Sequence, residues 1–245
     1  MDRLVQYSLS RGVARVALDS PRNRNALSAA LMSELEERLA DARDDEEVRV
    51  VELTHTGGTF CAGADLSEAR YGVDAPRVIA LLRQIVALPK PVVASVDGHV
   101  RAGGMGLVGA CDIALAGPAS TFAFSEVRLG LAPAMISLTT LPRLTARAAS
   151  RYYLTGETFD APTAAQIGLI TQAVDDIDAA TNAVLDALRK ASPQGLRETK
   201  PLTTQAVTFD NANALAEQSA RLFASDEARE GMTSFLEKRQ PRWAL

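Results

Sequence analysis

The chain has 245 residues, a formal net charge of −4 and 47% hydrophobic residues, which is the composition of an ordinary globular protein. Its slight negative charge and the absence of a basic run argue against binding to nucleic acid or to an anionic membrane surface. The only cysteines, Cys61 and Cys111, are too few for a disulfide framework or a structural zinc site. We therefore expect no metal, no redox cofactor and a reducing compartment.

The N-terminal residues show neither the apolar core nor the small-residue cleavage site of a signal peptide. No apolar stretch reaches the roughly 20 residues needed to span a bilayer. A cytoplasmic location, without a membrane or nucleic-acid partner, is the expectation.

The first part of the chain predicts strands that alternate with helices. Residues 5–9 and 13–18 have alternating polarity around a turn and predict a β-hairpin. Ser28 is the expected N-cap of a helix whose apolar positions recur at helical spacing. Buried strands are then predicted at 48–53, 91–96 and 112–116, a loop at 54–63, and helices at 74–88 and 103–110. This order predicts an α/β fold with several parallel strands.

The last third of the chain has a helical period. Helices are predicted at residues 146–154, 162–167, 177–191, 193–207, 212–223 and 226–238. No Gly/Ser/Pro-rich linker marks a freely moving domain. We predict an α/β core over residues 1–190 and a helical oligomerisation region over residues 191–245.

Residues 104–109 (GMGLVG) match the dinucleotide-binding pattern G-x-G-x-x-G. Residues 97–102 separate these glycines from the preceding strand, and the helix has room for only about two turns, so the match is weak. Gly103 and Gly104 instead begin a helix, where bare backbone amides favour a negatively charged ligand atom. An amide from the loop at residues 60–66 could complete an oxyanion hole, although each loop taken alone is better explained as a tight turn.

Several segments, in order and over essentially the whole chain, resemble the crotonase (enoyl-CoA hydratase/isomerase) superfamily. They include residues 24–27 (RNAL), 60–66 (FCAGADL), 90–98 (KPVVASVDG), 111–114 (CDIA), 122–130 (FAFSEVRLG), 154–157 (LTGE), 165–170 (AQIGLI) and 229–239. The resemblance implies a crotonase-like spiral of ββα units with a helical C-terminal trimerisation region. It also implies a homotrimer or a dimer of trimers, and an acyl-CoA substrate with no further cofactor.

The resemblance assigns roles to particular residues. The thioester carbonyl would lie between the amides of Ala62 and Gly103. The substrate-binding residues would be Arg24, Ala26, Gly63, Ala64, Asp65, Leu66 and Gly104, with Phe235 and Lys238 closing a CoA pocket on a neighbouring subunit. Arg101 could contact a substrate carboxylate or a CoA phosphate, but an exposed loop arginine is an equally good interpretation.

The carboxylates depart from the family pattern. Hydratases of this family usually hold a water between two glutamates. Glu126 matches the second and would move a proton at the substrate α-carbon, a task suited to a partly buried carboxyl group. Gly106 stands at the position of the first and cannot take a proton.

Three interpretations therefore remain. The first is a 2-enoyl-CoA hydratase that uses Glu126 and another polar group, such as Ser137 or Thr139. It is favoured because residues 130–137 (GLAPAMIS) resemble bacterial methylglutaconyl-CoA hydratase-like members. The second is a Δ3,Δ2-enoyl-CoA isomerase with a single glutamate. The third is a non-catalytic acyl-CoA-binding protein, against which the presence of both loops and Glu126 argues.

Overall fold

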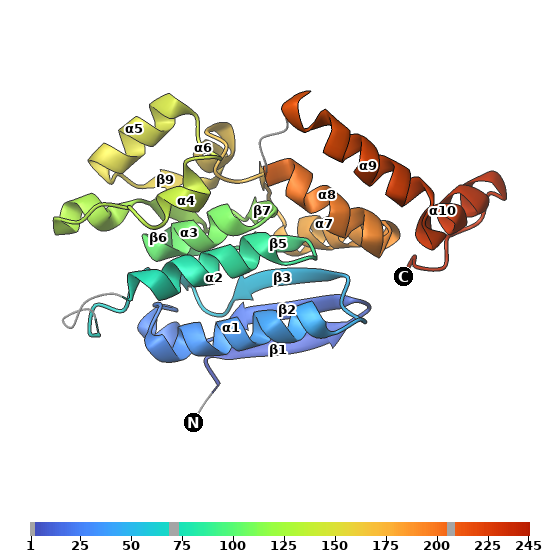
Figure 1. The fold of residues 1–245 in the computed structure, drawn as a ribbon. Coiled ribbons are helices and arrows are strands. Elements are labelled where there is room, and N and C mark those ends of the chain that lie inside the picture. Colours follow the sequence, from blue (N-terminus) through green and yellow to red (C-terminus); the bar gives the residue numbers. More distant parts are fainter. Residues whose placement is uncertain (1–2, 69–73, 205–208) are drawn as a thin grey trace.

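The computed structural model describes residues 3–68, 74–204 and 209–245, and it contains two β-sheets with helices packed around them (Figure 1). The larger sheet has the strand order β1-β2-β3-β5-β7-β10, and the smaller sheet has the order β4-β6-β8-β9. The strands are β1 Val5–Ser10, β2 Val13–Leu18, β3 Val50–His55, β4 Thr59–Cys61, β5 Val92–Val96, β6 His99–Arg101, β7 Ile113–Ala116, β8 Thr121–Ala123, β9 Phe159–Asp160 and β10 Gln172–Ala173.

The predicted hairpin and parallel core are both confirmed. β1 and β2 pair antiparallel, and β2, β3, β5, β7 and β10 continue the larger sheet in parallel. The α-helices are α1 Ala29–Asp44, α2 Ala75–Ala87, α3 Gly103–Ala110, α4 Ser137–Thr140, α5 Ala146–Thr155, α6 Ala161–Gln166, α7 Ile177–Lys190, α8 Pro193–Thr204, α9 Ala212–Phe223 and α10 Asp226–Leu236. The Ser28 side chain caps α1 by accepting a hydrogen bond from Leu31 N, as predicted.

The central strands β3 and β5 of the larger sheet are buried on both faces, which explains their continuous apolar runs. On one face, side chains such as Val51 and Ala94 join the main core with α1 and α2. On the other face, Val50 and Val93 pack against Leu185 of α7. Successive strand residues point to opposite faces, so both layers are built from the same strands.

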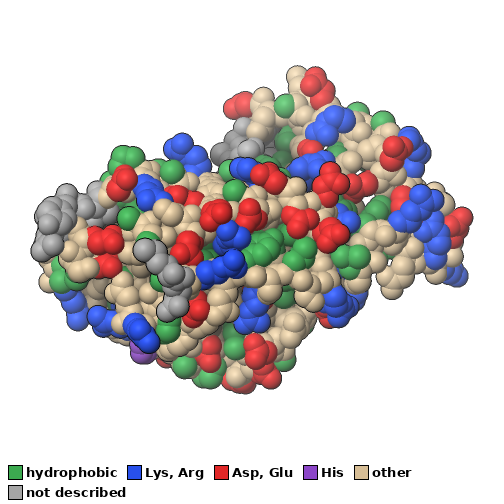
Figure 2. Space-filling view, turned by 90° about the horizontal axis from the view of Figure 1, so that it is seen from below, with side chains coloured by type: hydrophobic (Ala, Val, Ile, Leu, Met, Phe, Trp, Pro, Cys, Tyr) green, Lys and Arg blue, Asp and Glu red, His purple; other side chains and the backbone are tan. Residues whose placement is uncertain are grey.

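The C-terminal helices α9 and α10 extend from the core at the right of Figure 1. The preceding helix, α8, is held on the core by Lys200, whose Nζ lies 2.8 Å from a carboxylate oxygen of Asp112. The same ammonium group donates hydrogen bonds to the carbonyls of Ile85 and Lys90. On the face shown in Figure 2, acidic and basic side chains are interspersed rather than gathered in a patch of one sign.

Two details differ from the sequence expectations. The predicted loop at 54–63 contains β4, and the smaller sheet as a whole was missed because its strands have only two or three residues, too few for a visible period. The mainly helical last third also contributes β9 and β10 to the sheets. Residues 205–207 of the predicted helix 193–207 lie outside the described residues, and the domain boundary at residue 190 stays a prediction. No helix among the described residues is long and apolar enough to cross a membrane.

Candidate active site

A cavity of about 670 Å³ lies between the end of β4, the N-terminus of α3 and the segment that follows β8. Eight of the predicted site residues line it, namely Arg24, Ala26, Ala62, Ala64, Asp65, Leu66, Gly103 and Glu126. Its remaining lining is mostly apolar and includes Leu129, Leu131 and residues 132–136. Few polar groups in a mainly apolar hollow are typical of a site for a small organic ligand.

Asn25 fixes the first loop of this cavity. Its side chain is fully buried, accepts a hydrogen bond from Ser20 N and donates to the carbonyls of Thr56 and Thr59. Arg24 and Asn25 both have positive φ angles, of 52°, an uncommon conformation that Asn tolerates better than most residues. The resulting turn lays residues 24–27 beside the loop after β4, where Leu27 N donates to the Gly63 carbonyl at 2.8 Å.

This arrangement contradicts the role predicted for the Ala62 amide. Ala62 N donates to the Arg24 carbonyl at 3.0 Å, so it is not free to bind a substrate oxygen. The Ala64 amide has no acceptor among the described residues. The free donor of this loop is therefore two residues later than the sequence comparison suggested.

The second loop approaches the first very closely. A Cβ atom on Gly63, whose φ is +91°, would lie 3.2 Å from Gly103 N, and one on Gly103 would lie 3.8 Å from Ala64 N. Gly103 N belongs to the first turn of α3, whose amides have no partner within the helix. Ala102, just before it, has a φ of 45°, a strained value of the kind that collects at functional sites. The amides of Ala64 and Gly103 thus face the same cavity from two loops.

Glu126 is the unpartnered acid of the cavity. It lies in a 3-10 helix, Ser125–Leu129, which follows β8. Its Oε2 atom is buried and has no hydrogen-bond partner in the part of the chain that the structure describes. Burial raises the pKa of Glu126 above its ordinary value of 4.5. An orphaned carboxyl oxygen with a raised pKa is suited to exchanging a proton with a ligand.

Asp65 is the other carboxylate among the described lining residues, and its environment is the opposite. Its oxygens accept hydrogen bonds from Ser67 Oγ at 2.6 Å and from Asn23 Nδ2 at 2.8 Å. The bond from Ser67, together with that from Asn23, lowers the pKa of Asp65. Asp65 is therefore held as an anion that orders its own loop, and Glu126 is the described lining carboxyl group with an unpartnered oxygen.

The glycines of the G-x-G-x-x-G match serve helix packing. A Cβ on Gly104 would lie 2.7 Å from the Cys61 carbonyl, one on Gly106 2.7 Å from Ile136 Cγ2, and one on Gly109 2.7 Å from the Thr139 carbonyl. The pattern therefore lets α3 pack closely against β4 and α4, which agrees with rejecting a dinucleotide site. Position 106, where hydratases carry an acid, is filled by a neighbouring apolar side chain.

Arg101 does not line this cavity. Its guanidinium donates to the carbonyls of Val100 and Thr121 and to Thr121 Oγ1, within the smaller sheet. A contact of Arg101 with a substrate carboxylate or a CoA phosphate therefore stays a prediction. Gly63 and Gly104 also lie behind the lining rather than in it.

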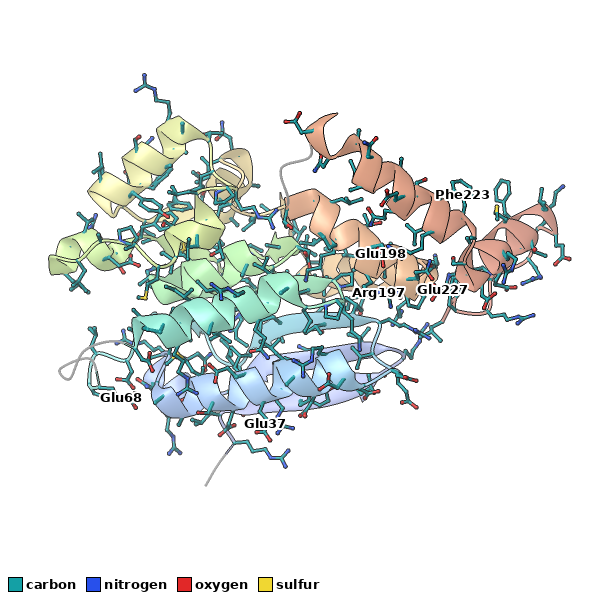
Figure 3. All side chains as sticks on the ribbon, viewed as in Figure 1. Glu37, Glu68, Arg197, Glu198, Phe223 and Glu227 are labelled. Carbon is teal, nitrogen blue, oxygen red and sulfur yellow. The ribbon has the colours of Figure 1, made fainter. Side chains whose placement is uncertain are left out.

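Phe235 and Lys238 lie at the C-terminal end of the molecule. Figure 3 places Glu68, next to the cavity residue Ser67, at the end opposite Glu227 of α10. Phe235 is 82% exposed on α10. The two residues do not reach the cavity of their own chain, and their role toward a neighbouring subunit stays a prediction.

Ile136 and Asn25 were missed as site-forming residues. An asparagine with a left-handed backbone followed by an apolar pair gives a weak turn signal. Nothing in the local sequence connects Ile136 with Gly106, which lies 30 residues earlier. The two hydroxyl groups predicted to help hold a water are bonded to backbone carbonyls instead. Ser137 Oγ donates to Ala134 O, and Thr139 Oγ1 donates to Gly106 O.

Taken together, the parallel core, the two amide-bearing loops and the orphaned acid describe a protein that can bind and polarise a small carbonyl ligand. A family model described as enoyl-CoA hydratase/isomerase matches residues 8–244. The human enoyl-CoA hydratase domain-containing protein 2, mitochondrial, is 33% identical over 251 residues, which cover 95% of this chain and 86% of that protein. The rat methylglutaconyl-CoA hydratase, mitochondrial, is 29% identical over 96% of this chain and 80% of its own length.

Solved structures agree with these sequence comparisons. An enoyl-CoA hydratase from Mycobacterium avium is 60% identical, with a TM-score of 0.80 over 99% of this chain and 100% of the other. An enoyl-CoA hydratase from Mycobacterium smegmatis is 30% identical, with a TM-score of 0.93 over 100% of both chains. The chain belongs to the enoyl-CoA hydratase/isomerase family, and the predicted crotonase-like α/β fold is confirmed.

Proposed function

We propose that the chain is an enzyme that binds an acyl-CoA thioester, stabilises its enolate with the amides of Ala64 and Gly103, and moves protons with Glu126. Membership of the family and the names of its relatives support a thioester substrate. Two backbone N–H groups on loops that line one cavity, with no acceptor among the described residues, support an oxyanion hole, which acts where charge develops in the reaction. Exposed Arg24, at the edge of the cavity, would bind CoA phosphates.

The reaction that this geometry supports best is the shift of a double bond in a 3-enoyl-CoA. The carboxylate of Glu126 removes a proton from C2, and the electrons form a dienolate whose thioester oxygen accepts hydrogen bonds from the two amides. Protonated Glu126 then returns the proton to C4, which gives the 2-enoyl-CoA. One carboxyl group and one oxyanion hole are sufficient for this proton-neutral exchange.

The observation that carries this choice is the packing at position 106. A second acid is absent there, and Ile136 fills the adjacent space, with its Cγ2 2.7 Å from the position of a Cβ. The sequence alone favoured hydration slightly over isomerisation. Because position 106 has no polar side chain that could hold a water, we rank isomerisation above hydration.

Hydration of a 2-enoyl-CoA is the second candidate, and it is favoured by the names of the relatives, which include hydratases. Glu126 alone would then have to hold the attacking water and return its proton to C2. A methylglutaconyl substrate is less favoured because Arg101 is bonded within the smaller sheet. No cofactor beyond the CoA of the substrate enters either reaction.

We also propose a homotrimer or a dimer of trimers, in which Phe235 and Lys238 of one copy close the CoA site of the next. The exposure of Phe235 supports an apolar contact with another chain. Residues 191–245 would be the region that makes this contact.

The test of the proposed function is to incubate purified protein with a 3-enoyl-CoA, crotonyl-CoA and 3-methylglutaconyl-CoA, and to separate the products by chromatography and mass. Conversion of the 3-enoyl thioester without a mass change supports isomerisation. A gain of one water on a 2-enoyl substrate, with no isomerisation, would favour hydration instead. Tight binding without turnover of any of the three would support the binding-protein interpretation.

A further inference from the structure

Ile136 occupies the space that any side chain at position 106 would need. Its Cβ and Cγ2 would lie 3.1 Å and 2.7 Å from a Cβ on Gly106, and Leu82 Cδ1 would lie at 3.4 Å. Ile136 is 2% exposed and lines the same cavity as Glu126. The space beside position 106 is therefore occupied by aliphatic carbon from α2 and from the residue before α4.

Hydrogen bonds hold Ile136 in this position. Thr140 Oγ1 donates to the Ile136 carbonyl at 2.7 Å, and Thr139 Oγ1 donates to the Gly106 carbonyl at 2.9 Å. The absence of a side chain on Gly109 permits this packing, because a Cβ on Gly109 would lie only 2.7 Å from the Thr139 carbonyl oxygen. These contacts fix the backbone that carries Ile136 against α3.

The same network leads to the environment of Glu126. The Tyr153 hydroxyl shares a hydrogen bond of 2.5 Å with Thr140 Oγ1, and the Tyr153 ring packs on Phe124 with centroids 4.4 Å apart. Phe124 lies two residues before Glu126. Burial raises the pKa of Tyr153, and the nearby negative charge of Glu126 raises it further. These contacts therefore connect the segment that carries Ile136 with the segment that carries Glu126, and both residues line the cavity.

We propose that Ile136 is the specificity-determining residue that makes this site transfer protons rather than add water. An ordered water in a protein interior needs two to four polar partners. At position 106, Ile136 and Leu82 supply none, so the place of the first family glutamate offers no second polar partner to a water held by Glu126. This inference rests on the proposed acyl-CoA function.

The sharpest test compares Ile136→Thr with Ile136→Val, because the two new side chains have nearly the same shape and differ by a hydroxyl in place of a methyl group. We expect Ile136→Thr to add water to crotonyl-CoA about tenfold faster than Ile136→Val, the effect of one added hydrogen bond. Each hydration rate is divided by the isomerisation rate of the same variant on the 3-enoyl-CoA, so that a general loss of activity from the changed cavity wall cancels, and this ratio should be about tenfold higher in Ile136→Thr. Equal hydration by the two variants would overturn the role of Ile136.

A second pair of variants introduces the acid itself. Gly106→Glu alone should lower the melting temperature and gain no hydration activity, because its side chain would clash with Ile136. The double variant Gly106→Glu with Ile136→Ala should hydrate crotonyl-CoA at least about 100-fold faster than Ile136→Ala alone. Met135→Ala, which enlarges the same cavity without opening position 106, is the control and should gain none.

The outcomes also separate this inference from the proposed function. Rapid hydration by the unmodified protein would overturn the inference while leaving the acyl-CoA function intact. So would a folded double variant that isomerises but does not hydrate. Should the double variant not fold, the comparison of the threonine and valine variants still decides. Absence of turnover of any CoA thioester by the unmodified protein would contradict the proposed function itself.

Discussion

Glu126 of the cavity and the glutamates of the C-terminal region lie in opposite environments. In the C-terminal region the acids are paired, as Glu198 is with Arg221 and Glu230 with Arg239, while Phe223 and Phe235 are exposed (Figure 3). At the cavity, Glu126 has a buried carboxyl oxygen without a hydrogen-bond partner among the described residues. The bond from Arg239 lowers the pKa of Glu230 to about 2, whereas burial raises the pKa of Glu126.

The difference indicates what each region is for. A carboxyl group that is costly to ionise is useful where a proton must be exchanged. Paired charges with exposed apolar side chains are instead typical of a surface that another protein covers. Chemistry is therefore expected at the cavity and association at α9 and α10, and variants matched between the two regions can test that division.

The largest expected effect is on turnover. Glu126→Gln keeps the size of the side chain but cannot accept a proton, so we expect at least a 100-fold loss of kcat with substrate binding retained, a typical contribution of acid–base catalysis. Glu230→Gln, in the C-terminal region, is the matched control and should keep its turnover. Similar turnover rates for both variants would contradict a role of Glu126 in proton transfer.

The next effect concerns the attachment of the C-terminal region to the core. Lys200 is 6% exposed, and Lys200→Met would leave the half-buried Asp112 without its ion pair. Breaking a buried pair on one side costs about 3–5 kcal/mol, which denaturant unfolding would measure. Exposed Lys190, changed to Met, is the control and should alter stability by no more than about 0.5 kcal/mol. A Lys200→Met protein as stable as the control would mean that this ion pair does not anchor α8.

A smaller effect, of opposite sign in the two regions, is expected in the pH dependence of stability. Glu126 has a raised folded-state pKa, so above its ordinary pKa of 4.5 its ionisation opposes folding. Glu126→Gln should therefore melt higher than the unmodified protein at pH 7, and this gain should vanish below pH 4.5.

Glu230 has a folded-state pKa lowered to about 2, so its stabilising contribution is present at pH 7 and is lost as the pH falls from 4.5 toward 2. Glu230→Gln should melt lower at pH 7, with the gap closing on acidification. Thermal melts between pH 3 and 7 would check both signs. Parallel curves for the two variants would contradict the contrast between the two carboxyl groups.

The smallest effect is expected from Phe235→Ser. Because Phe235 is 82% exposed in the single chain, its loss should leave the fold intact and weaken contacts with another copy. Light scattering over a range of protein concentrations would measure the molar mass, and the KM for a CoA thioester should rise a few-fold if Phe235 closes a neighbour's site. An unchanged mass and KM would leave Phe235 without the proposed role.

Much of the fold could be predicted from the sequence because its long elements carry a clear period. The hairpin, α1 with its Ser28 cap and the helices of the last third all have enough residues to show alternation or helical spacing. The smaller sheet could not be found in this way, because β4, β6 and β8 have three residues each. Pairing between distant segments, not local preference, forms these strands.

The candidate site was predictable as a set of loops but not in its atomic detail. The loop at residues 60–66, the N-terminus of α3 and Glu126 do meet at one cavity. Which amide is free depends on the carbonyl of Arg24, which captures Ala62 N and leaves Ala64 N. The contact of Ile136 with position 106 depends in the same way on how α4 packs on α3, which a local pattern does not reveal.

The most direct test of the central claim is the exchange of the C2 hydrogens of a saturated acyl-CoA, such as butyryl-CoA, in D₂O. This reaction needs only enolate stabilisation by the amides and a proton acceptor, so it does not depend on the choice between isomerisation and hydration. We predict deuterium incorporation at C2, seen by mass spectrometry or NMR, and its loss in Glu126→Gln. No incorporation with bound thioester, or equal incorporation in the variant, would contradict the proposed roles of the Ala64 and Gly103 amides and of Glu126.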